Sequence, residues 1–208
     1  MYHWYTLPLP RYHRLPEERQ QQILRTARGH IARSGASGAS YNQIIADCGI
    51  SKTSAYHYFD GRDDLIAEVT RDSLGRVLDA LGPWRPAKTP ATFWKRLRGT
   101  ADNLRDFVAA APDHLAVLKE SYSSGTLAME HGDESSALDW IDALLDNGAA
   151  LGVVRHDVDR GLLRLATLAL FRAIDAWALS GMSPDGTLDL GPGFRLLASL
   201  WAKPKKGR

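Results

Sequence analysis

Apolar residues recur along most of this chain at intervals of three and four positions, the spacing of one face of an α-helix. The first such segment covers residues 16–34, where Ile23, Ala27 and Ile31 form the apolar face and arginines lie off it. Later segments, residues 92–110, 112–123, 134–151 and 157–179, repeat this spacing. No segment shows the strict alternation of a half-buried β-strand. The pattern therefore predicts an all-α fold.

Residues 40–59 interrupt these long segments with two short helical ones. Ser40 opens a Ser-x-x-Gln capping box, and the helix that follows has Ile44 and Ile45 as its apolar side and ends at Gly49. Ser51 is then the N-cap of a second short helix. Two short helices joined by a glycine-containing turn are typical of a helix-turn-helix, whose second helix enters the major groove of DNA.

The second short helix carries small or polar residues where it would face outward. Lys52 can bind guanine, and the hydroxyls of Thr53 and Ser54 can bind several bases or a phosphate. Tyr56 and His57 combine an apolar ring with a polar tip. This composition fits a nucleic-acid contact better than a second long core helix.

The segments "ILRTARGHIARSG" and "SYNQIIADCGISKTSAYHYFDGRDDL" together resemble the TetR-like (TetR/AcrR) transcriptional regulators. The resemblance covers about residues 17–70. The matching positions are Gly35, Ile44, Ile45, Gly49, Ile50, Ser51, Tyr56, Phe59 and Arg62. Two of them depart from the usual pattern, since Ile45 replaces a small alanine and Arg62 replaces the commoner lysine.

The resemblance implies a homodimer with an N-terminal three-helix helix-turn-helix DNA-binding domain and a helical C-terminal ligand-binding and dimerisation domain. The resemblance also implies that the protein is a repressor, which binds double-stranded DNA at a palindromic operator and is released by an unidentified small-molecule effector. The implied DNA-binding residues are Ser40, Tyr41, Asn42, Lys52, Thr53, Ser54, Tyr56, His57, Tyr58 and Arg62. Any one of these side chains could instead be merely solvated or part of the core.

The Pro- and Gly-rich stretch "LGPWRPAKTP" marks the expected module boundary. We expect a flexible N-terminal arm (1–16), a DNA-binding domain (17–80), an effector-binding and dimerisation domain (81–203) and a basic tail (204–208). Residues 1–59 carry seven Lys/Arg against three Asp/Glu, whereas residues 60–202 carry fifteen against twenty-one. A basic first third favours a polyanionic partner. Arg11 and Arg14 raise the hypothesis that the arm reaches a minor groove.

Two sets of residues in the C-terminal part are weaker candidates. The helix at 157–179 is apolar nearly all round, and with the last helix it could form half of a four-helix bundle across a two-fold axis. The predicted dimer interface comprises Leu162, Leu165, Leu168, Ala169, Ala173, Ala176, Phe194, Leu197 and Trp201. The predicted effector site comprises Trp94, Asn103, Phe107, His114, Tyr122, Trp140, Phe171 and Trp177. For both sets, packing in a monomer core is the alternative.

Other classes of function find little support. The single cysteine, Cys48, excludes an internal disulfide and fits a reducing cytoplasm, although an oxidation sensor is conceivable. The stretches "HGDE" and "RHDVD" lack metal-ligand spacing, and no nucleophile and base converge, so we expect no metal, no cofactor and no enzyme. The N-terminal residues lack a secretory pattern, and Arg164, Arg172 and Asp175 argue against a membrane span at 161–179. The main alternative is a non-specific architectural DNA-binding protein. A helical small-molecule carrier or an enzyme is a second and weaker alternative.

Overall fold

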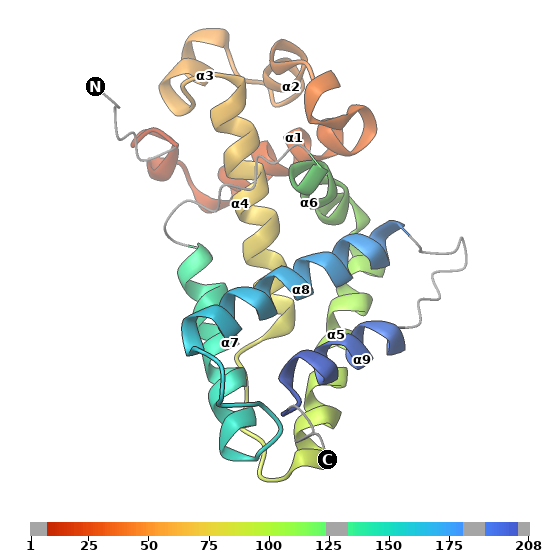
Figure 1. The fold of residues 1–208 in the computed structure, drawn as a ribbon. Coiled ribbons are helices and arrows are strands. Elements are labelled where there is room, and N and C mark those ends of the chain that lie inside the picture. Colours follow the sequence, from red (N-terminus) through yellow and green to blue (C-terminus); the bar gives the residue numbers. More distant parts are fainter. Residues whose placement is uncertain (1–7, 124–132, 181–189, 204–208) are drawn as a thin grey trace. The chain divides into compact units, whose positions relative to one another are not determined.

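The computed structural model describes residues 8–123, 133–180 and 190–203. These residues form helices and no strand, so the predicted all-α fold is confirmed (Figure 1). The elements are η1 (Tyr12–Arg14), α1 (Glu17–Gly38), α2 (Tyr41–Asp47), α3 (Lys52–Tyr58), α4 (Arg62–Leu81), α5 (Pro90–Ala110), α6 (Pro112–Ser123), α7 (Asp133–Ala150), α8 (Arg160–Ser180) and α9 (Gly191–Trp201).

The chain divides into two compact units. The first unit contains residues 1–77 and 110–128, and the second contains residues 78–109 and 129–208. The division falls close to the expected boundary at residue 80. It differs in one respect, because α6 belongs to the first unit, where it lies along α1.

The core of the first unit is built on the predicted face of α1. Ile23, Ala27 and Ile31 are all buried there, and they pack with residues from η1, α2, α4 and α6. Helix α1 is broken at Gly35, whose φ of 69° is left-handed, and one further turn follows. Gly35 therefore interrupts the regular helix where the sequence predicted its end.

The N-terminal segment is not a flexible arm over residues 8–16. Tyr12 is 1% exposed in the core of the first unit, and its ring centroid lies 4.9 Å from that of Phe59. This part of the prediction is wrong, because one buried aromatic ring is enough to hold a short segment against the fold. Residues 1–7 of the predicted arm and the basic tail at 204–208 lie outside the described residues.

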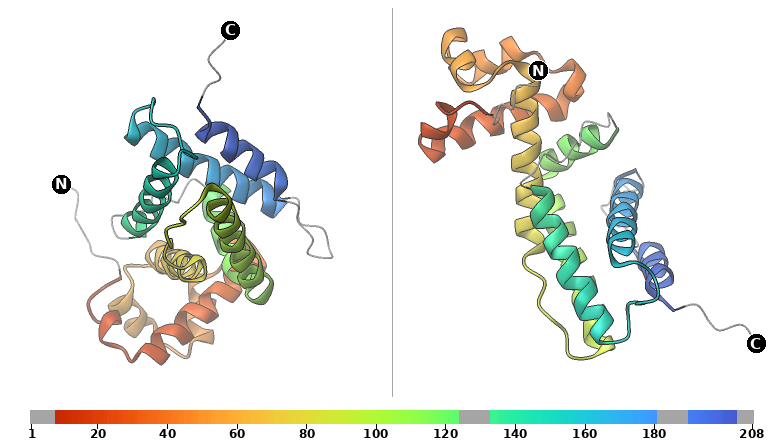
Figure 2. Two further views of the ribbon diagram at one scale, coloured as in Figure 1. Left: turned by 90° about the horizontal axis from the view of Figure 1, so that it is seen from below. Right: turned by 60° about the vertical axis from the view of Figure 1, so that its left-hand side comes forward.

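The second unit is organised around aromatic rings. Phe93 of α5 contacts Trp84, Trp94 and Trp201, with centroid distances of 5.3, 5.6 and 6.1 Å. Helices α7 and α8 pack together, as do α8 and α9 (Figure 2). Asn147 of α7 ties the linker to this core, because its amide oxygen accepts from Trp84 Nε1 at 3.2 Å and from Ala87 N at 2.7 Å.

Candidate nucleic-acid interface

Both short helices begin with the side-chain caps that the sequence predicts. The hydroxyl of Ser40 accepts from Gln43 N at 3.4 Å, and the hydroxyl of Ser51 accepts from Ser54 N at 3.1 Å. Only half of the capping box forms at Ser40, since the Gln43 side chain donates to Asp47 instead. Each cap satisfies one backbone N–H that a helix start would otherwise leave unpaired.

The turn between α2 and α3 depends on Gly49. Its φ of 64° is left-handed, a conformation that costs a residue with a Cβ roughly 1–2 kcal/mol. The tight turn is closed by Gly49 N donating to Ala46 O at 2.9 Å and Ile50 N donating to Ile45 O at 3.0 Å. Helix α3 can therefore start three residues after Gly49.

Buried residues fix the two short helices to the rest of the first unit. Ile44, Ile45 and Ala55 are buried, which anchors α2 and α3 on their inner sides. Arg19 of α1, which the sequence analysis missed, donates to Cys48 O at 2.9 Å and so caps the end of α2. An arginine at a helix C-terminus also balances the partial negative charge there.

The outward side of α3 is polar and accessible. Lys52, Thr53 and His57 are exposed, and Tyr56 keeps 58% of its surface. Ser54 is half-buried beside the Ser51 hydroxyl. From α2 and its cap, Ser40 and Asn42 are also exposed. The structure thus brings most of the predicted DNA-binding residues onto one helix and the start of its neighbour (Figure 1).

Tyr41 and Tyr58 do not present free hydroxyls in the same way. The Tyr41 hydroxyl is buried and has no hydrogen-bond partner among the described residues. Burial raises the pKa of Tyr41 to about 12, helped by the neighbouring Tyr56. Tyr58 is half-buried and packs against the core of the first unit. Both rings act as supports for α3 in this conformation, so we remove Tyr41 from the contact residues.

Arg62 has a structural function that the sequence did not reveal. Its Nε donates to Ala39 O at 3.1 Å, and Nη2 donates to Ala36 O. These carbonyls belong to the last turn of α1 and its C-cap. With two of its three nitrogens bound there, Arg62 holds the end of α1 beside the start of α4 and is a positioning residue.

The predicted effector residues are divided between the two units. His114 lies in the first unit, buried and 3.1 Å from the Ser73 hydroxyl, whereas Trp94, Phe107, Trp140 and Phe171 are half-buried in the second unit. Asn103 and Trp177 are exposed, and the side chain of Tyr122 lies outside the described residues. His114 belongs to a different unit from the four half-buried rings, because α6, which follows the linker in sequence, returns to the first unit.

The predicted dimer residues also separate by burial. Leu162 and Leu165 of α8 are 60% and 57% exposed, and Ala169, Ala173 and Ala176 are exposed as well. Leu197 and Trp201 are 3% and 0% exposed, so their side chains form the unit's own core and do not fit the prediction that they face a second copy. Leu168 and Phe194 pack partly against that core. Leu196, which the sequence analysis did not include, is 56% exposed on α9.

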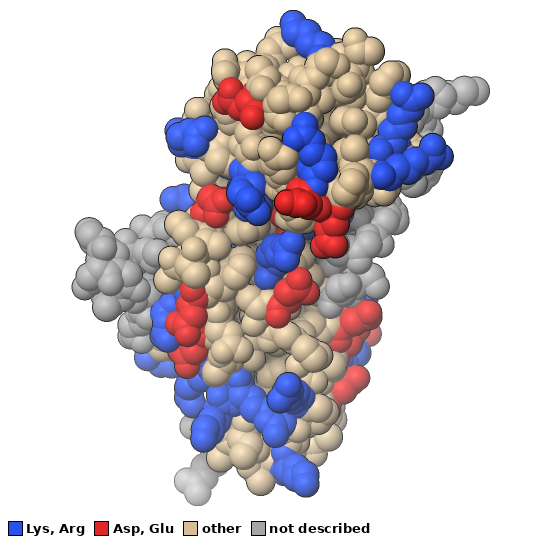
Figure 3. Space-filling model, turned by 180° about the vertical axis from the view of Figure 1, so that it is seen from behind, with Lys and Arg blue, Asp and Glu red and all other residues tan. Residues whose placement is uncertain are grey.

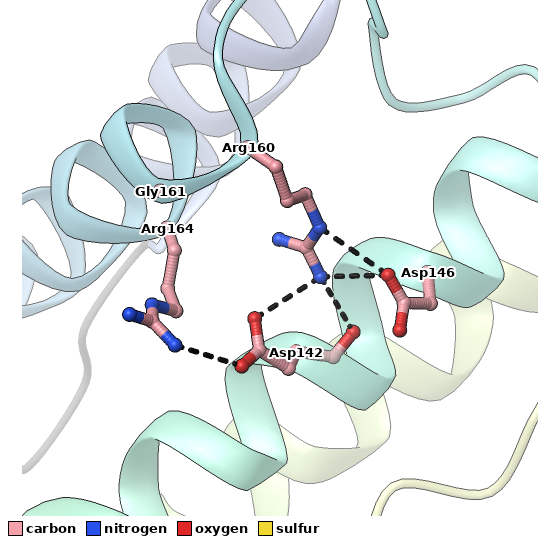
Figure 4. A pocket seen from close by; sticks show the side chains of 5 residues that line it. All are labelled: Asp142, Asp146, Arg160, Gly161 and Arg164. Carbon is pink, nitrogen blue, oxygen red and sulfur yellow. Dashed lines mark hydrogen bonds and ion pairs between the residues drawn. The ribbon is translucent and has the colours of Figure 1, made fainter.

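A shallow hollow of about 460 Å³ in the second unit is lined by Asp142, Asp146, Arg160, Gly161 and Arg164 (Figure 4). Its charges pair with one another, since Arg160 lies 2.7 Å from Asp146 and 3.1 Å from Asp142. Arg164 is likewise 3.1 Å from Asp142. These ion pairs join α7 to the start of α8.

Charge is distributed less simply than the sequence totals indicated. Figure 3, which views the molecule from the side opposite to Figure 1, shows Lys and Arg on the surfaces of both units. In the second unit, the stretch from residue 82 to 101 contains basic residues and no acid. Its exposed members are Arg85, Lys88, Lys95, Arg96 and Arg98. The second unit therefore also has a basic surface region.

Within the described residues, no group of His, Cys, Asp and Glu has the arrangement of a metal site. The described helices are also too short or too polar to cross a bilayer. Cys48 is buried, and desolvation raises the pKa of its thiol.

Comparison with known proteins matches the first unit to a family. Residues 23–69 match the model "Bacterial regulatory proteins, tetR family". This match includes α2, α3 and their turn, so the resemblance drawn from the sequence is confirmed. No curated protein sequence matches the chain significantly.

Solved structures resemble the chain over most of its length. A putative TetR-family transcription regulator from Shewanella sp. PV-4 has a TM-score of 0.60 at 16% identity, covering 88% of this chain and 96% of that one. A TetR-like transcriptional regulator from Rhodococcus sp. RHA1 has a TM-score of 0.57 at 23% identity, with coverages of 89% and 95%. The regulator FadR from Bacillus subtilis, solved with stearoyl-CoA, has a TM-score of 0.60 at 15% identity, with coverages of 87% and 97%. At these identities the likeness shows a shared fold.

Proposed function

We propose that this chain, which has the fold of TetR-family transcriptional regulators and their DNA-binding domain in its first unit, is a sequence-specific repressor. In this proposal it binds a palindromic operator as a homodimer, and a small molecule releases it. The observation that carries the proposal is the outward side of α3. It is polar and exposed, and it stands on a capped, buried base. A surface helix whose inner side is anchored this way suits insertion into a major groove.

At the operator, base recognition falls to α3. Lys52 can donate to guanine O6 and N7, and Thr53 and His57 can bind other base edges. In this proposal, the exposed side chains of Ser40 and Asn42, at the start of α2, bind backbone phosphates, which the positive potential of a helix N-terminus favours. Two copies of α3 would read the two half-sites of the palindrome.

The proposed dimer forms through α8 and α9. Leu162, Leu165 and Leu196 each keep more than half of their surface. After Leu165, the exposed residues of α8 whose side chains are described are three alanines and Trp177, and the small alanines allow another helix to approach closely. Burying this strip against a second copy would recover about 25 cal/mol per Å² of apolar surface. A two-fold symmetric contact needs only this one surface.

We place the effector in the second unit, near the half-buried rings of Trp94, Trp140 and Phe171. Mostly apolar linings with few polar groups are typical of ligand sites. Asp175, one helical turn after Phe171 on α8, would be the polar group, and burial raises its pKa to about 6. The solved structure of the FadR regulator with stearoyl-CoA supports ligand binding in this fold, although its ligand is not transferred to this chain.

Selection from random double-stranded DNA tests the proposal directly. Fragments bound by the purified protein at fixed salt should converge on one palindromic sequence, bound about 10³-fold or more tightly than random DNA. An architectural protein would retain fragments without a shared sequence, and this result would refute specific regulation. A chain that binds no duplex at all would point instead to the carrier or enzyme alternative.

Substitution of Lys52 then tests the assignment of base reading to α3. Lys52→Ala should weaken operator binding and change the sequence recovered at one position of each half-site. Lys95→Ala, which removes an exposed lysine from α5 in the second unit, is the matched control and should change neither. An identical recovered sequence for Lys52→Ala would exclude it from base contact.

A further inference from the structure

The segment just before α1 is fixed beside the recognition helix. Pro8 and Tyr12 are buried, and Leu9 N donates to Tyr58 O at 2.9 Å, at the end of α3. The segment also closes on itself, since Tyr12 N donates to Leu9 O at 2.9 Å. Residues 8–15 are therefore an ordered part of the DNA-binding domain, although the family match begins only at residue 23.

This segment carries two arginines that lie on the same side. Arg11 precedes the 3-10 turn η1 and Arg14 is its last residue, three positions later. A 3-10 helix has three residues per turn, so side chains at i and i+3 lie on the same side. Both arginines are exposed. Among the described residues, neither guanidinium has a carboxylate within ion-pair distance.

These arginines share a hollow with α3. An open depression of about 380 Å³ is lined by Leu9, Pro10, Arg11, Arg14, Tyr56 and His57. Its lining combines two arginines without acid partners and two amphipathic rings of the recognition helix. No acidic side chain lines it, so its charge is uncompensated.

We propose that Arg11 and Arg14 bind the DNA sugar–phosphate backbone next to the bases read by α3, with the hollow receiving the strand. This inference rests on the proposed DNA-binding function. Because α3 would lie in the major groove, a phosphate strand bordering that groove would run beside it, and the hollow shares Tyr56 and His57 with α3. Guanidinium forks match phosphate oxygens in geometry and charge. The buried Tyr12 holds them in place before DNA arrives, so little ordering entropy is lost on binding.

A backbone contact predicts a particular signature. Each phosphate neutralised contributes about 0.9 to the slope of log K against log salt on duplex DNA. Two arginines per protomer should therefore contribute a slope of about 2 per protomer. Since phosphates carry no sequence, their loss should weaken binding to all duplexes alike.

The experiment uses the double variant R11Q/R14Q in the full chain, which keeps Tyr12 and thus the anchor. Fluorescence anisotropy with the selected operator and with a scrambled duplex, across a salt series, gives affinity and slope together. We expect about 10-fold or greater loss on both duplexes, a lower slope and an unchanged recovered sequence. The matched control R85Q/R105Q removes the same charge from exposed positions of the second unit and should leave all three unchanged.

Each other outcome has a defined meaning. If folded R11Q/R14Q, verified by circular dichroism, binds with the wild-type affinity and slope, the backbone contact is refuted. A changed recovered sequence would also overturn it, in favour of base reading. R11K/R14K keeps charge but loses the fork and should restore the slope with only part of the affinity. A wild-type protein that binds no duplex would sink the proposed function itself, a result separate from these.

Discussion

The two units of this protein bury their helices with different chemistry. In the first unit, a charged side chain lies at the meeting of α1, α4 and α6. Arg28 Nε is 2.7 Å from Asp113 Oδ2, and Arg28 Nη1 is 3.1 Å from Asp72 Oδ2. Beside them, His114 and Ser73 share a buried hydrogen bond of 3.1 Å.

In the second unit, aromatic rings fill the core between the helices. Trp201 is fully buried against Phe93, Trp94 and Phe171. Its single polar atom, Nε1, donates to the Thr167 hydroxyl at 3.0 Å. The rings contribute area and shape, and the Nε1 atoms of Trp84, Trp140 and Trp201 are paired.

The difference teaches what each unit is sensitive to. An ion pair is directional and depends on charge, so removal of one partner leaves a charge in a poorly solvated place. Ring packing depends on volume, so a cavity is its main weakness. We therefore expect removal of a charged partner to be most costly in the first unit, and loss of side-chain volume to be most costly in the second.

Substitution of Arg28 should have the largest effect. Arg28→Ala should lower the free energy of unfolding by about 3–5 kcal/mol, because the nearly buried Asp72 loses its shortest ion pair. The pairing with Asp113, whose side chain is 35% exposed, will contribute less because solvent screens it. Urea unfolding measures the change. Arg25→Ala, an exposed arginine on the same helix, should stay within about 0.5 kcal/mol. Equal effects of the two variants would contradict the comparison.

Truncation of a leucine tests the second unit. Leu197→Ala should cost about 3 kcal/mol, since it opens a cavity beside the aromatic cluster. Its neighbour Leu196 is exposed on the same helix, so Leu196→Ala should cost less than about 1 kcal/mol at dilute protein. Urea unfolding at several protein concentrations separates the fold from association. A cost for Leu196→Ala that grows with concentration would support the proposed dimer surface.

Acid should act on the two units in opposite directions. Burial, together with the charge of Arg28, holds the pKa of His114 below its ordinary value, so its neutral form stabilises the folded state above pH 6.5. That stability is lost as pH falls below 6.5, by at most about 1.4 kcal/mol per pH unit. Burial raises the pKa of Asp175 to about 6, so protonating it as pH falls from 7 to 5 adds stability.

Two variants isolate these contributions in pH series of urea unfolding. H114Q should flatten the loss of stability below pH 6.5, whereas D175N should remove the gain. If H114Q shows the wild-type dependence, the buried histidine is not the group that responds. The difference between each variant and the wild type cancels the carboxylates that do not interact with the substituted side chain. Asp113 is not one of these for H114Q, because the charge of His114 is among the causes that lower its pKa.

The smallest effect concerns Tyr41. Its buried hydroxyl lacks a partner among the described residues, so Tyr41→Phe should leave stability unchanged or raise it by up to about 1 kcal/mol. DNA affinity should also stay unchanged, as measured by anisotropy. A loss of affinity in Tyr41→Phe would mean that the hydroxyl turns outward when DNA binds.

Local features of this fold could be predicted from the sequence, because their causes lie within a few residues. The caps at Ser40 and Ser51, the turn at Gly49 and the apolar face of α1 are of this kind. Long-range contacts could not be predicted. Arg19 caps α2 from 29 residues away, and nothing near Arg62 shows that it binds carbonyls of α1.

The candidate sites of the second unit show a related limit. Helical spacing indicates that a residue is buried, but it cannot tell whether a ring packs in a core or lines a ligand site. Trp201 was therefore assigned to a surface that it does not reach. The burial of Tyr12 was missed for a different reason, since the N-terminal segment has no helical periodicity to show which of its aromatic residues is buried.

The burial of Cys48 gives this protein a natural reporter. As the chain's sole thiol, enclosed in the first unit with a raised pKa, it should react with an alkylating reagent only when that unit opens. The labelling rate would then measure the opening equilibrium of the first unit alone, without an introduced probe. Addition of operator DNA should slow the labelling, so the reaction rate of this one thiol would report the fraction of protein bound to DNA.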